Sequence, residues 1–426
     1  MLSVAEALTA VLAEVPAPRL EQVMLADALG RVLGEPAFSD VDSPPHDKSL
    51  VDGYAVLAAD LTAGVREFDV IEEVTAGAVP VRRVEPGRAV RIMTGAPLPD
   101  GADCVVMVEQ SEFIAAPPTS ELLGRVSLQV DRFRAGQNIM RRAQSLSRGQ
   151  RLLEPGRRLR AAEIGLLAET GHARVAVRRR PTVAILSTGN ELTEVDETPG
   201  PGRIRNSNGP MLDALVRQVG AEPRDLGIGR DDALDLRERI ARGLKSDCLV
   251  LSGGVSAGVL DLVPQVLREL GVEQRFHKIH MRPGKPLWFG VAASGCLVFG
   301  LPGNPVSSLV CFELFVRPAL ERMTGLDSVG LPLRVARLAR DFTQRGDRPT
   351  YFPAWCEETS AVSLEPTTSH PTDLSQPVRI VRLLDWQGSA DLRTLTDANC
   401  LAFFPPGEKT YQAGEWIEVR CFDQRD

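Results

Sequence analysis

Two segments in the first part of the chain repeat apolar residues at the spacing of an amphipathic helix. Residues 3–15 and 160–170 each place apolar side chains on one helical face, which favours helices there. Residues 45–134 lie between them and hold short apolar runs separated by turn residues, a pattern typical of strands. The pattern predicts a helical linker domain made of residues 1–44 and 135–178, with a β-rich domain inserted at 45–134.

Strand-like and helix-like segments alternate from residue 179 onward. Apolar runs at 183–188 and 248–254 indicate buried strands, and segments with helical periodicity separate them. This alternation predicts a doubly wound, mostly parallel α/β sheet over residues 179–326. Residues 327–426 carry apolar runs between turn residues and lack a convincing helical period, which predicts a C-terminal β-barrel. The expected fold class is a multidomain α/β protein.

Three glycine-bearing turns follow predicted strands directly. They are STGNE (187–191), SGGVS (252–256) and GLPGNP (300–305). In a doubly wound sheet, ligands bind beyond the carboxyl ends of the strands, so these turns mark a candidate binding edge. Asn304 suits the N-cap and Pro305 the first position of the next helix, whose N–H groups would attract an anion. Taken alone, GLPGNP is equally consistent with a tightly packed turn.

Charge and cysteine usage narrow the class of protein. The net charge of −7, from 49 Lys and Arg against 56 Asp and Glu, argues against nucleic acid or an anionic membrane as the main partner. No apolar run reaches membrane-spanning length, and the acidic, amphipathic N-terminus does not resemble a signal peptide. Seven scattered cysteines without a C-x-x-C pair predict reduced thiols in the cytoplasm and no zinc site. His277 and His280 fall on opposite faces of a predicted strand, so a metal pair is not expected.

Six separate motifs, in order and with the right gaps, resemble one family along nearly the whole chain. They are DKSLVDGYAV (47–56), MTGAPLPDGAD (93–103), STGNEL (187–192), SGGVSAG (252–258), MRPGKPLWFGV (281–291) and GLPGNP (300–305), and the likeness continues to QGSADLRTLTDANCLAFFPPGE (387–408). The chain is similar to the molybdopterin molybdenumtransferases, the MoeA and gephyrin E-domain family.

The resemblance implies an enzyme of the last step of molybdenum cofactor assembly. Such a transferase holds adenylylated molybdopterin, inserts molybdate at its dithiolene and releases AMP, assisted by Mg²⁺. The resemblance also implies an elongated, cytoplasmic homodimer whose cleft receives residues from both subunits. A molybdopterin adenylyltransferase and molybdoenzyme acceptors are the implied protein partners. Molybdate and tungstate match in charge and nearly in size, so the sequence does not choose between them.

The motifs also carry over site residues one by one. The implied catalytic residues are Asp52, Thr94, Glu191 and Asp231, and the implied metal ligands are Glu191, Asp231 and Asp261. Ser252, Gly253, Gly254, Gly303, Asn304 and Pro305 match substrate-binding positions. Arg282, Lys285, Pro286, Arg348 and Ser389 match molybdate-binding positions, the last two within a divergent barrel.

The chemistry of the residues agrees with these roles. A pyrophosphate needs N–H-lined turns without side chains, which Gly253, Gly254 and Gly303 supply. Molybdate is a dianion, and the Pro-Gly turn between Arg282 and Lys285 would aim both cations at one spot.

Several of these residues also have a purely structural interpretation. Asp231 and Asp261 each precede a predicted helix and would serve as caps. Asp52 would brace its own turn through an Asx bond, and Lys285 outside its motif would be an ordinary surface charge.

The chain departs from the family pattern at several polar positions. Ser145, Asn190 and Val259 stand where the family commonly has acids; Met140 replaces a basic residue, Gln144 an acid, and Arg282 a lysine. Fewer carboxylates leave open a second interpretation: a non-catalytic or weakly catalytic paralogue that binds molybdopterin or molybdate as a carrier or scaffold. A molybdopterin adenylyltransferase is a third alternative, against which the full length and the C-terminal barrel argue.

Overall fold

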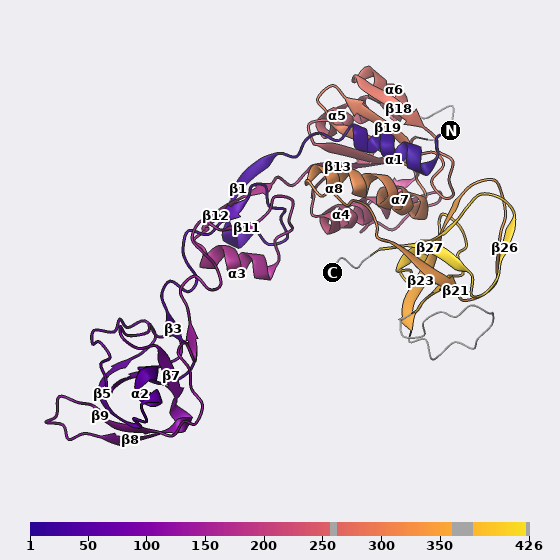
Figure 1. Cartoon of the computed structure of the whole chain (residues 1–426). Helices are drawn as coiled ribbons and strands as arrows, with labels where there is room; N and C mark the ends of the chain where they lie inside the picture. Colours follow the sequence, from indigo (N-terminus) through magenta and orange to yellow (C-terminus); the bar gives the residue numbers. More distant parts are fainter. Residues whose placement is uncertain (256–261, 360–377, 423–426) are drawn as a thin grey trace.

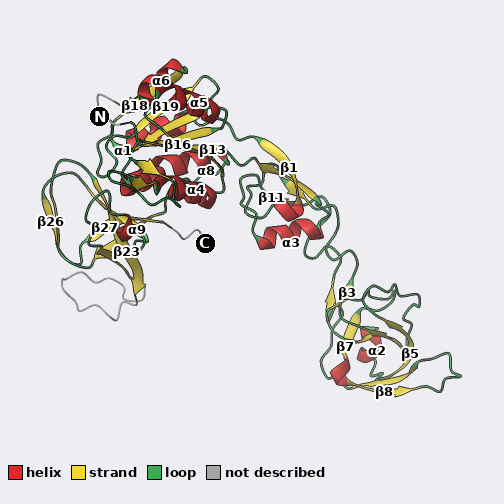
Figure 2. Cartoon of the chain, turned by 180° about the vertical axis from the view of Figure 1, so that it is seen from behind, coloured by secondary structure: helices red, strands yellow, loops and turns green. Residues whose placement is uncertain are grey.

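The computed structural model describes residues 1–255, 262–359 and 378–422 of an elongated chain. Figure 1 shows an α/β body with a barrel beside it, a narrow middle part, and a β-rich part at the far end of the molecule. Figure 2 shows the same arrangement from behind. The N-terminal helix lies on the α/β body, so the chain leaves this body, forms the far end and returns.

The α/β body is built on a six-stranded sheet with the predicted doubly wound character. Its strands, in spatial order, are β16 (Glu222–Gly229), β13 (Thr182–Thr188), β17 (Cys248–Ser252), β20 (Leu297–Leu301), β19 (Trp288–Ala292) and β18 (Val272–His277). The first four run parallel, and β19 is antiparallel to both of its neighbours. The carboxyl ends of β13, β17 and β20 therefore meet at one edge, as the sequence predicts.

Helices cover both faces of this sheet because β13 is apolar on both sides. Val183 and Ile185 pack into one buried cluster, and Ala184 and Leu186 into the other. The first face carries α1 (Val4–Ala13), α4 (Asn208–Val219), α7 (Pro305–Cys311), a π-helical turn (Phe312–Val316) and α8 (Arg317–Met323). The second face carries α5 (Ala233–Gly243) and α6 (Val263–Glu269).

The position of α1 corrects the predicted domain division. Residues 1–44 were expected to lie wholly within the linker domain, yet Ala7 and Val11 are fully buried in the same cluster as Leu320 of α8. The apolar face of α1 is satisfied by the large core of the α/β body. The middle part keeps a single helix of its own, α3 (Ala161–Glu169), near the predicted 160–170.

The middle part consists mainly of paired strands. The antiparallel pairs are β1 (Leu20–Met24) with β12 (Arg174–Arg178), β2 (Ala37–Phe38) with β11 (Arg151–Leu153), and β3 (Lys48–Ser49) with β10 (Ile139–Met140). A 3-10 turn (Leu25–Asp27) follows β1. Because outgoing and returning segments pair three times, the chain forms a narrow double connection to the far end.

The far end is the predicted β-rich part. Its sheet holds β7 (Cys104–Met107), β4 (Gly53–Val56), β6 (Arg88–Ile92), β5 (Glu67–Val74), β9 (Gly124–Leu128) and β8 (Ser111–Ala115), in that order, with the short α2 (Ala58–Thr62) and a 3-10 turn (Val108–Gln110). Tyr54, Phe68 and Leu128 are among its fully buried side chains. This core is separate from that of the α/β body.

The C-terminal part is the predicted barrel. Strands β21 (Leu333–Leu338), β24 (Val378–Leu383), β23 (Thr350–Thr359), β25 (Cys400–Phe404) and β27 (Trp416–Cys421) form a closed barrel, and β22 (Phe342–Gln344) pairs with β26 (Lys409–Tyr411). A one-turn helix, α9 (Leu392–Leu395), precedes β25 and was not predicted. Within the described ranges, none of the helices combines the length and apolar character needed to cross a lipid bilayer.

Candidate functional site

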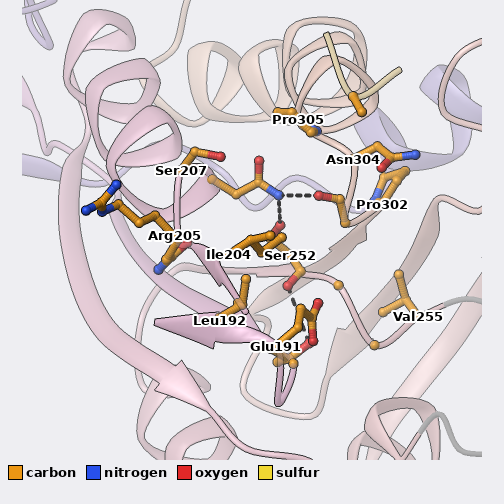
Figure 3. A pocket seen from close by; sticks show the side chains of 18 of the residues that line it. Glu191, Leu192, Ile204, Arg205, Ser207, Ser252, Val255, Pro302, Asn304 and Pro305 are labelled. Atoms are coloured by element: carbon orange, nitrogen blue, oxygen red, sulfur yellow. Dashed lines mark hydrogen bonds between the residues drawn. The ribbon is translucent and has the colours of Figure 1, made fainter. Parts of the chain in front are cut away.

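A cavity of about 670 Å³ opens at the carboxyl ends of β13, β17 and β20. Figure 3 shows polar side chains and turns converging on it from several elements. The predicted residues that line it are Glu191, Asp231, Ser252, Gly253, Gly254, Pro286, Gly303, Asn304 and Pro305. Further lining residues are Thr188, Gly189, Leu192, Ile204, Arg205, Asn206, Ser207, Asn208, Val255, Pro302 and Ala390. The three glycine-bearing turns thus meet in one place.

Two glycines of the SGG turn are required by its backbone. Gly253 has φ +89° and Gly254 has φ +64°, both in the left-handed region that favours glycine. A Cβ at Gly253 would lie 2.6 Å from the carbonyl oxygen of Thr188, and one at Gly254 would lie 2.7 Å from Thr188 Oγ1. This turn holds its shape only without side chains, and it leaves the end of β17 open to the cavity.

Gly303 has a different role from these two glycines. A Cβ built there would meet nothing closer than the Cα of Gly253, at 3.8 Å. Packing within the chain therefore leaves room for a side chain at Gly303, and its absence adds open space to the cavity wall. Such a position suits the close approach of a ligand to the backbone.

The side-chain amide of Asn208 joins two of the turns. Its Nδ2 donates to Ser252 Oγ and to the carbonyl oxygen of Gly303, each at 2.7 Å. The carbonyl of Gly303 only accepts hydrogen bonds, so the amide nitrogen must face it, and this fixes the orientation of the amide. Sequence reasoning missed Asn208. The available signal was the polar run Asn206-Ser207-Asn208 directly before a predicted helix.

Asn304 does not cap its helix in the expected way. It occupies the N-cap position of α7, but its Nδ2 donates to Ser389 Oγ at 2.8 Å, and it forms no side-chain cap bond. The N–H of Val306 donates to the carbonyl oxygen of Ser389 at 3.1 Å, so one helix N–H is already occupied. The barrel segment around Ser389 thus closes one end of the cavity instead of leaving the whole helix start open for an anion.

Glu191, Asn190 and Asp231 form an acidic edge of the cavity. The N–H of Asn190 donates to Asp231 Oδ2 at 3.3 Å, and the N–H of Asp231 donates to Asn190 Oδ1 at 3.2 Å. Glu191 folds toward Gly189, where a Cβ would lie 2.3 Å from Oε2. Two carboxylates and one amide oxygen, all on exposed residues, therefore lie along one rim.

The cap of α5 is a different aspartate from the one weighed in the sequence. Asp232 occupies the N-cap and accepts hydrogen bonds from the N–H groups of Leu234 and Asp235, at 3.1 and 2.9 Å. Asp231 is thereby released from a capping role and faces the cavity. The predicted ligand Asp261 and the departure at Val259 lie outside the described residues.

The predicted molybdate-binding loop is held against the barrel. The N–H of Arg282 donates to the Pro349 carbonyl at 2.9 Å, and the N–H of Tyr351 donates to the Arg282 carbonyl at 2.8 Å. Arg348 Nη1 reaches the carbonyl oxygen of Met281 at 3.5 Å. Both barrel positions carried over from the family thus adjoin loops of the α/β body: Arg348 beside this loop, and Ser389 beside the GLPGNP turn.

The cations of this loop lie outside the cavity wall. Arg282 and Lys285 are exposed, whereas Pro286, the next residue, is part of the wall. The loop therefore presents its two cations to solvent beside the cavity. Both side chains can therefore reach a ligand that protrudes from the cavity.

Asp52 and Thr94 lie together but not at the cavity. The carboxylate oxygen Oδ1 of Asp52 accepts from the N–H of Thr94 at 2.6 Å and from Thr94 Oγ1 at 2.7 Å. These bonds from Thr94 hold the pKa of the Asp52 carboxyl below its ordinary value. Asp52 directly precedes β4 in the β-rich part, which lies at the opposite end of the molecule from the α/β body. Thr94, and not an Asx bond within the turn, is its partner.

The loop that carries Ser145 lies in the narrow middle part. The N–H of Ser145 donates to the carbonyl oxygen of Ser43 at 2.9 Å, and Gln144 Oε1 accepts from the N–H of Arg141 at 2.9 Å. Met140, in β10, pairs with Lys48 of β3. The backbone of this loop is therefore ordered by local bonds that involve no carboxylate at positions 144 and 145.

Family models match three stretches of the chain. Residues 2–171 match the MoeA N-terminal region (domain I and II), residues 184–322 a probable molybdopterin binding domain, and residues 376–422 the MoeA C-terminal region (domain IV). These stretches include most of the residues that line the cavity.

Similar proteins match over nearly the whole length. A molybdopterin molybdenumtransferase of Bacillus subtilis is 34% identical over 405 residues, covering 94% of this chain and 89% of that protein. One from Staphylococcus aureus is 33% identical over 403 residues, covering 93% and 90%. The crystal structure of a molybdopterin biosynthesis MoeA protein from Pyrococcus superposes with a TM-score of 0.80 at 31% identity, covering 100% of both chains.

Proposed function

The chain belongs to the MoeA family of molybdopterin molybdenumtransferases, and from this premise we propose that it inserts molybdate into adenylylated molybdopterin and releases AMP, in molybdenum cofactor biosynthesis. The observation that carries the proposal is the convergence of the STGNE, SGG and GLPGNP turns on one cavity of about 670 Å³. A cavity of this size accommodates a small organic ligand. Its wall offers backbone, hydroxyl and carboxylate groups at the carboxyl edge of a parallel sheet.

The SGG turn and Ser252 would hold the phosphate groups of the substrate. Ser252 Oγ accepts a hydrogen bond from Asn208, so its own proton is free to point into the cavity. The glycine backbone allows phosphate oxygens to approach N–H groups without meeting a side chain. Gly303, in the neighbouring turn, leaves space for the same approach.

The substrate molybdate would meet Arg282 and Lys285 beside the cavity. Both side chains are exposed on a loop whose next residue, Pro286, lines the wall. Exposed cations attract a dianion from solvent, and Arg348 lies near enough to the same loop to add a third positive charge. Ser389 would add a hydroxyl group from the barrel, and its hydrogen bond from Asn304 holds it beside the GLPGNP turn.

Glu191 and Asp231 would hold Mg²⁺ at the acidic rim. Mg²⁺ is usually bound by one or two carboxylates together with waters and substrate phosphates, and this rim supplies two carboxylates and the amide oxygen of Asn190. Among the described residues, no group of three or more His, Cys, Asp and Glu side chains is arranged to hold a metal on its own. A bound Mg²⁺ would neutralise phosphate charge, so the rim would act together with the substrate.

A second copy of the chain would supply Asp52 and Thr94. These residues lie at the opposite end of an elongated molecule from the cavity, so one chain does not bring the two sets together. A symmetric dimer whose two elongated copies lie antiparallel would place the β-rich part of each near the cavity of the other. Asp52 would then enter the site as a carboxylate with a lowered pKa.

The test is whether the purified full-length protein itself converts adenylylated molybdopterin. It is incubated with adenylylated molybdopterin, molybdate and Mg²⁺, and AMP is measured by chromatography. We expect molybdate-dependent AMP release. If adenylylated molybdopterin binds but no AMP appears at any Mg²⁺ concentration, the carrier or scaffold function replaces the proposed transferase.

A further inference from the structure

Three of the seven cysteines lie together at one end of the C-terminal barrel. Cys356 is on β23, Cys400 on β25 and Cys421 on β27. Cys400 is directly opposite Cys421 in the β25–β27 register, and directly opposite Ala354 in the β23–β25 register. Cys356 is two residues beyond Ala354, so its side chain points to the same face of the sheet as that of Cys400.

The side chains of Cys356 and Cys400 are in direct contact. They share a side-chain hydrogen bond, and the thiol of Cys400 also contacts the Ala354 carbonyl oxygen at 3.4 Å. Cys400 is fully buried, whereas Cys356 is only partly buried and open to small solutes. The pair therefore combines an accessible sulfur with a protected one.

Cys356 differs from the other cysteines in its tendency to ionise. The hydrogen bond from Cys400 lowers its pKa, and Arg379 on the adjacent strand adds to the effect against the cost of burial. The same hydrogen bond and burial raise the pKa of Cys400. Burial raises the pKa of Cys104 to about 11 and that of Cys296 to about 12. Thiolate is the reactive form, so reaction is directed to Cys356.

Asn399 holds the backbone of this pair in place. Its Oδ1 accepts from the N–H of Cys356 and its Nδ2 donates to the Cys356 carbonyl, each at 2.7 Å. Because Asn399 directly precedes Cys400, the two exchanged bonds fix the separation of the cysteines. The backbone around the pair is therefore ordered, with both cysteines on the same face of adjacent strands.

We propose that Cys356 and Cys400 are a peroxide-sensitive thiol pair that closes to an intramolecular disulfide. The Cys356 thiolate attacks one oxygen of hydrogen peroxide, the O–O bond breaks, and hydroxide leaves to become water, giving a sulfenic acid at Cys356. The sulfur of Cys400 then attacks the Cys356 sulfur, the sulfenic oxygen leaves as water with the Cys400 proton, and the S–S bond forms. Two electrons pass from the thiols to the peroxide, which is the only oxidant required.

The test uses the reduced full-length protein and hydrogen peroxide. Free thiols are alkylated after exposure, and digested peptides are analysed by mass spectrometry. We expect the loss of two of the seven free thiols and a cross-linked peptide pair that joins Cys356 to Cys400, both reversed by dithiothreitol. A Cys400–Cys421 cross-link, or seven free thiols after exposure, would overturn the proposal.

Two variants separate the roles of the sulfurs. Cys356→Ser changes a partly buried position and should abolish the peroxide-dependent thiol loss. Cys421→Ser is the matched control, since it removes the neighbouring half-buried thiol and should leave the Cys356–Cys400 disulfide intact. Retained oxidation in Cys356→Ser would contradict the assignment of Cys356 as the attacking sulfur, as would its loss in Cys421→Ser.

Discussion

The side-chain amide of Asn208 donates to the hydroxyl oxygen of Ser252 across 2.7 Å, and so ties the start of α4 to the end of β17. Its second bond, to the carbonyl oxygen of Gly303, brings in the turn after β20. One side chain thereby sets the relative position of two neighbouring turns that both line the cavity. Asn208 is 8% exposed, so these bonds are shielded from water.

The first prediction concerns Asn208 itself. Asn208→Ala should weaken binding of adenylylated molybdopterin by roughly 5- to 150-fold, since a lost buried hydrogen bond costs about 1–3 kcal/mol. Asn208→Asp should show a similar loss, because a carboxylate cannot donate to the Gly303 carbonyl. Fluorescence titration measures the affinity, and a double-mutant cycle with Ser252→Ala measures the coupling. Additive effects of the two substitutions would show that Asn208 does not act through Ser252.

The second prediction concerns the molybdate contact. Lys285→Ala should remove a charge-assisted contact of about 1.5–3 kcal/mol, a loss of roughly 10- to 150-fold in molybdate affinity. Lys285→Arg should restore it only in part, because a planar fork replaces a point charge. Lys245→Ala is the matched control, since Lys245 is an exposed lysine just before β17, at the opposite edge of the sheet. Equal affinities for Lys285→Ala and Lys245→Ala in isothermal titration would remove Lys285 from the site.

The sequence predicted the edges of the cavity better than its interior. STGNE, SGG and GLPGNP were recognisable because all three directly follow predicted strands of one doubly wound sheet, whose carboxyl ends are the usual place for a ligand. Asn208 was missed because a polar residue at the start of a helix is commonplace, and its two partners, Ser252 and Gly303, lie far away in the sequence. Such contacts depend on how the strands are ordered in the sheet, which periodicity does not specify.

The same limit applies to α1 and Asn304, whose local structure was predicted but whose packing partners were not. The amphipathic pattern of α1 correctly gave a helix, but it does not say which apolar surface the helix covers. The N-cap preference of Asn304 is a local tendency, and a tertiary partner, Ser389, took the side chain instead. The local sequence pattern therefore predicts the type of element, whereas the residues that it contacts depend on tertiary packing.

The third prediction tests whether the site is shared between two chains. Asp52→Ala and Lys285→Ala should each lose activity alone, yet a mixture refolded or co-expressed in equal amounts should recover about a quarter of the wild-type rate of AMP release, as expected for random pairing in a symmetric dimer. In a mixed dimer, one cavity keeps its own Lys285 and receives Asp52 from the other chain. A mixture no more active than the single variants would place the complete site within one chain.

The fourth prediction concerns pH. Bonds from Thr94 lower the pKa of Asp52, so Asp52 stays ionised to a lower pH than an ordinary aspartate. Thr94→Val removes the hydroxyl donor and keeps the backbone one, so the pKa of Asp52 should rise. If the ionised form is needed, the acidic limb of the pH–rate profile for AMP release should move to higher pH. Asp52→Asn should be inactive across the range, and an unmoved acidic limb in Thr94→Val would exclude Asp52 as the titrating group.

The last prediction concerns the acidic rim, where Asn190 stands at a position for which the resemblance to the family implies an acid. Asn190 Oδ1 accepts the N–H of Asp231, and a carboxylate oxygen in its place would accept the same bond. Asn190→Asp should therefore keep the backbone geometry while adding a third negative charge beside Asp231 and Glu191. Affinity for a hard cation rises with the charge of its ligands, so less Mg²⁺ should be needed for half-maximal AMP release.

Without Mg²⁺, the same substitution should lower the thermal stability of the protein. The added carboxylate lies beside Asp231 and repels its carboxylate, so the melting temperature of metal-free Asn190→Asp should fall below that of wild type and recover when Mg²⁺ is added. Asp232→Asn is the matched control: it changes the neighbouring cap of α5, whose acceptor oxygen is retained, and should leave the Mg²⁺ dependence unchanged. If Asn190→Asp and Asp232→Asn show the same Mg²⁺ dependence as wild type, both in AMP release and in melting temperature, Mg²⁺ does not bind at this rim.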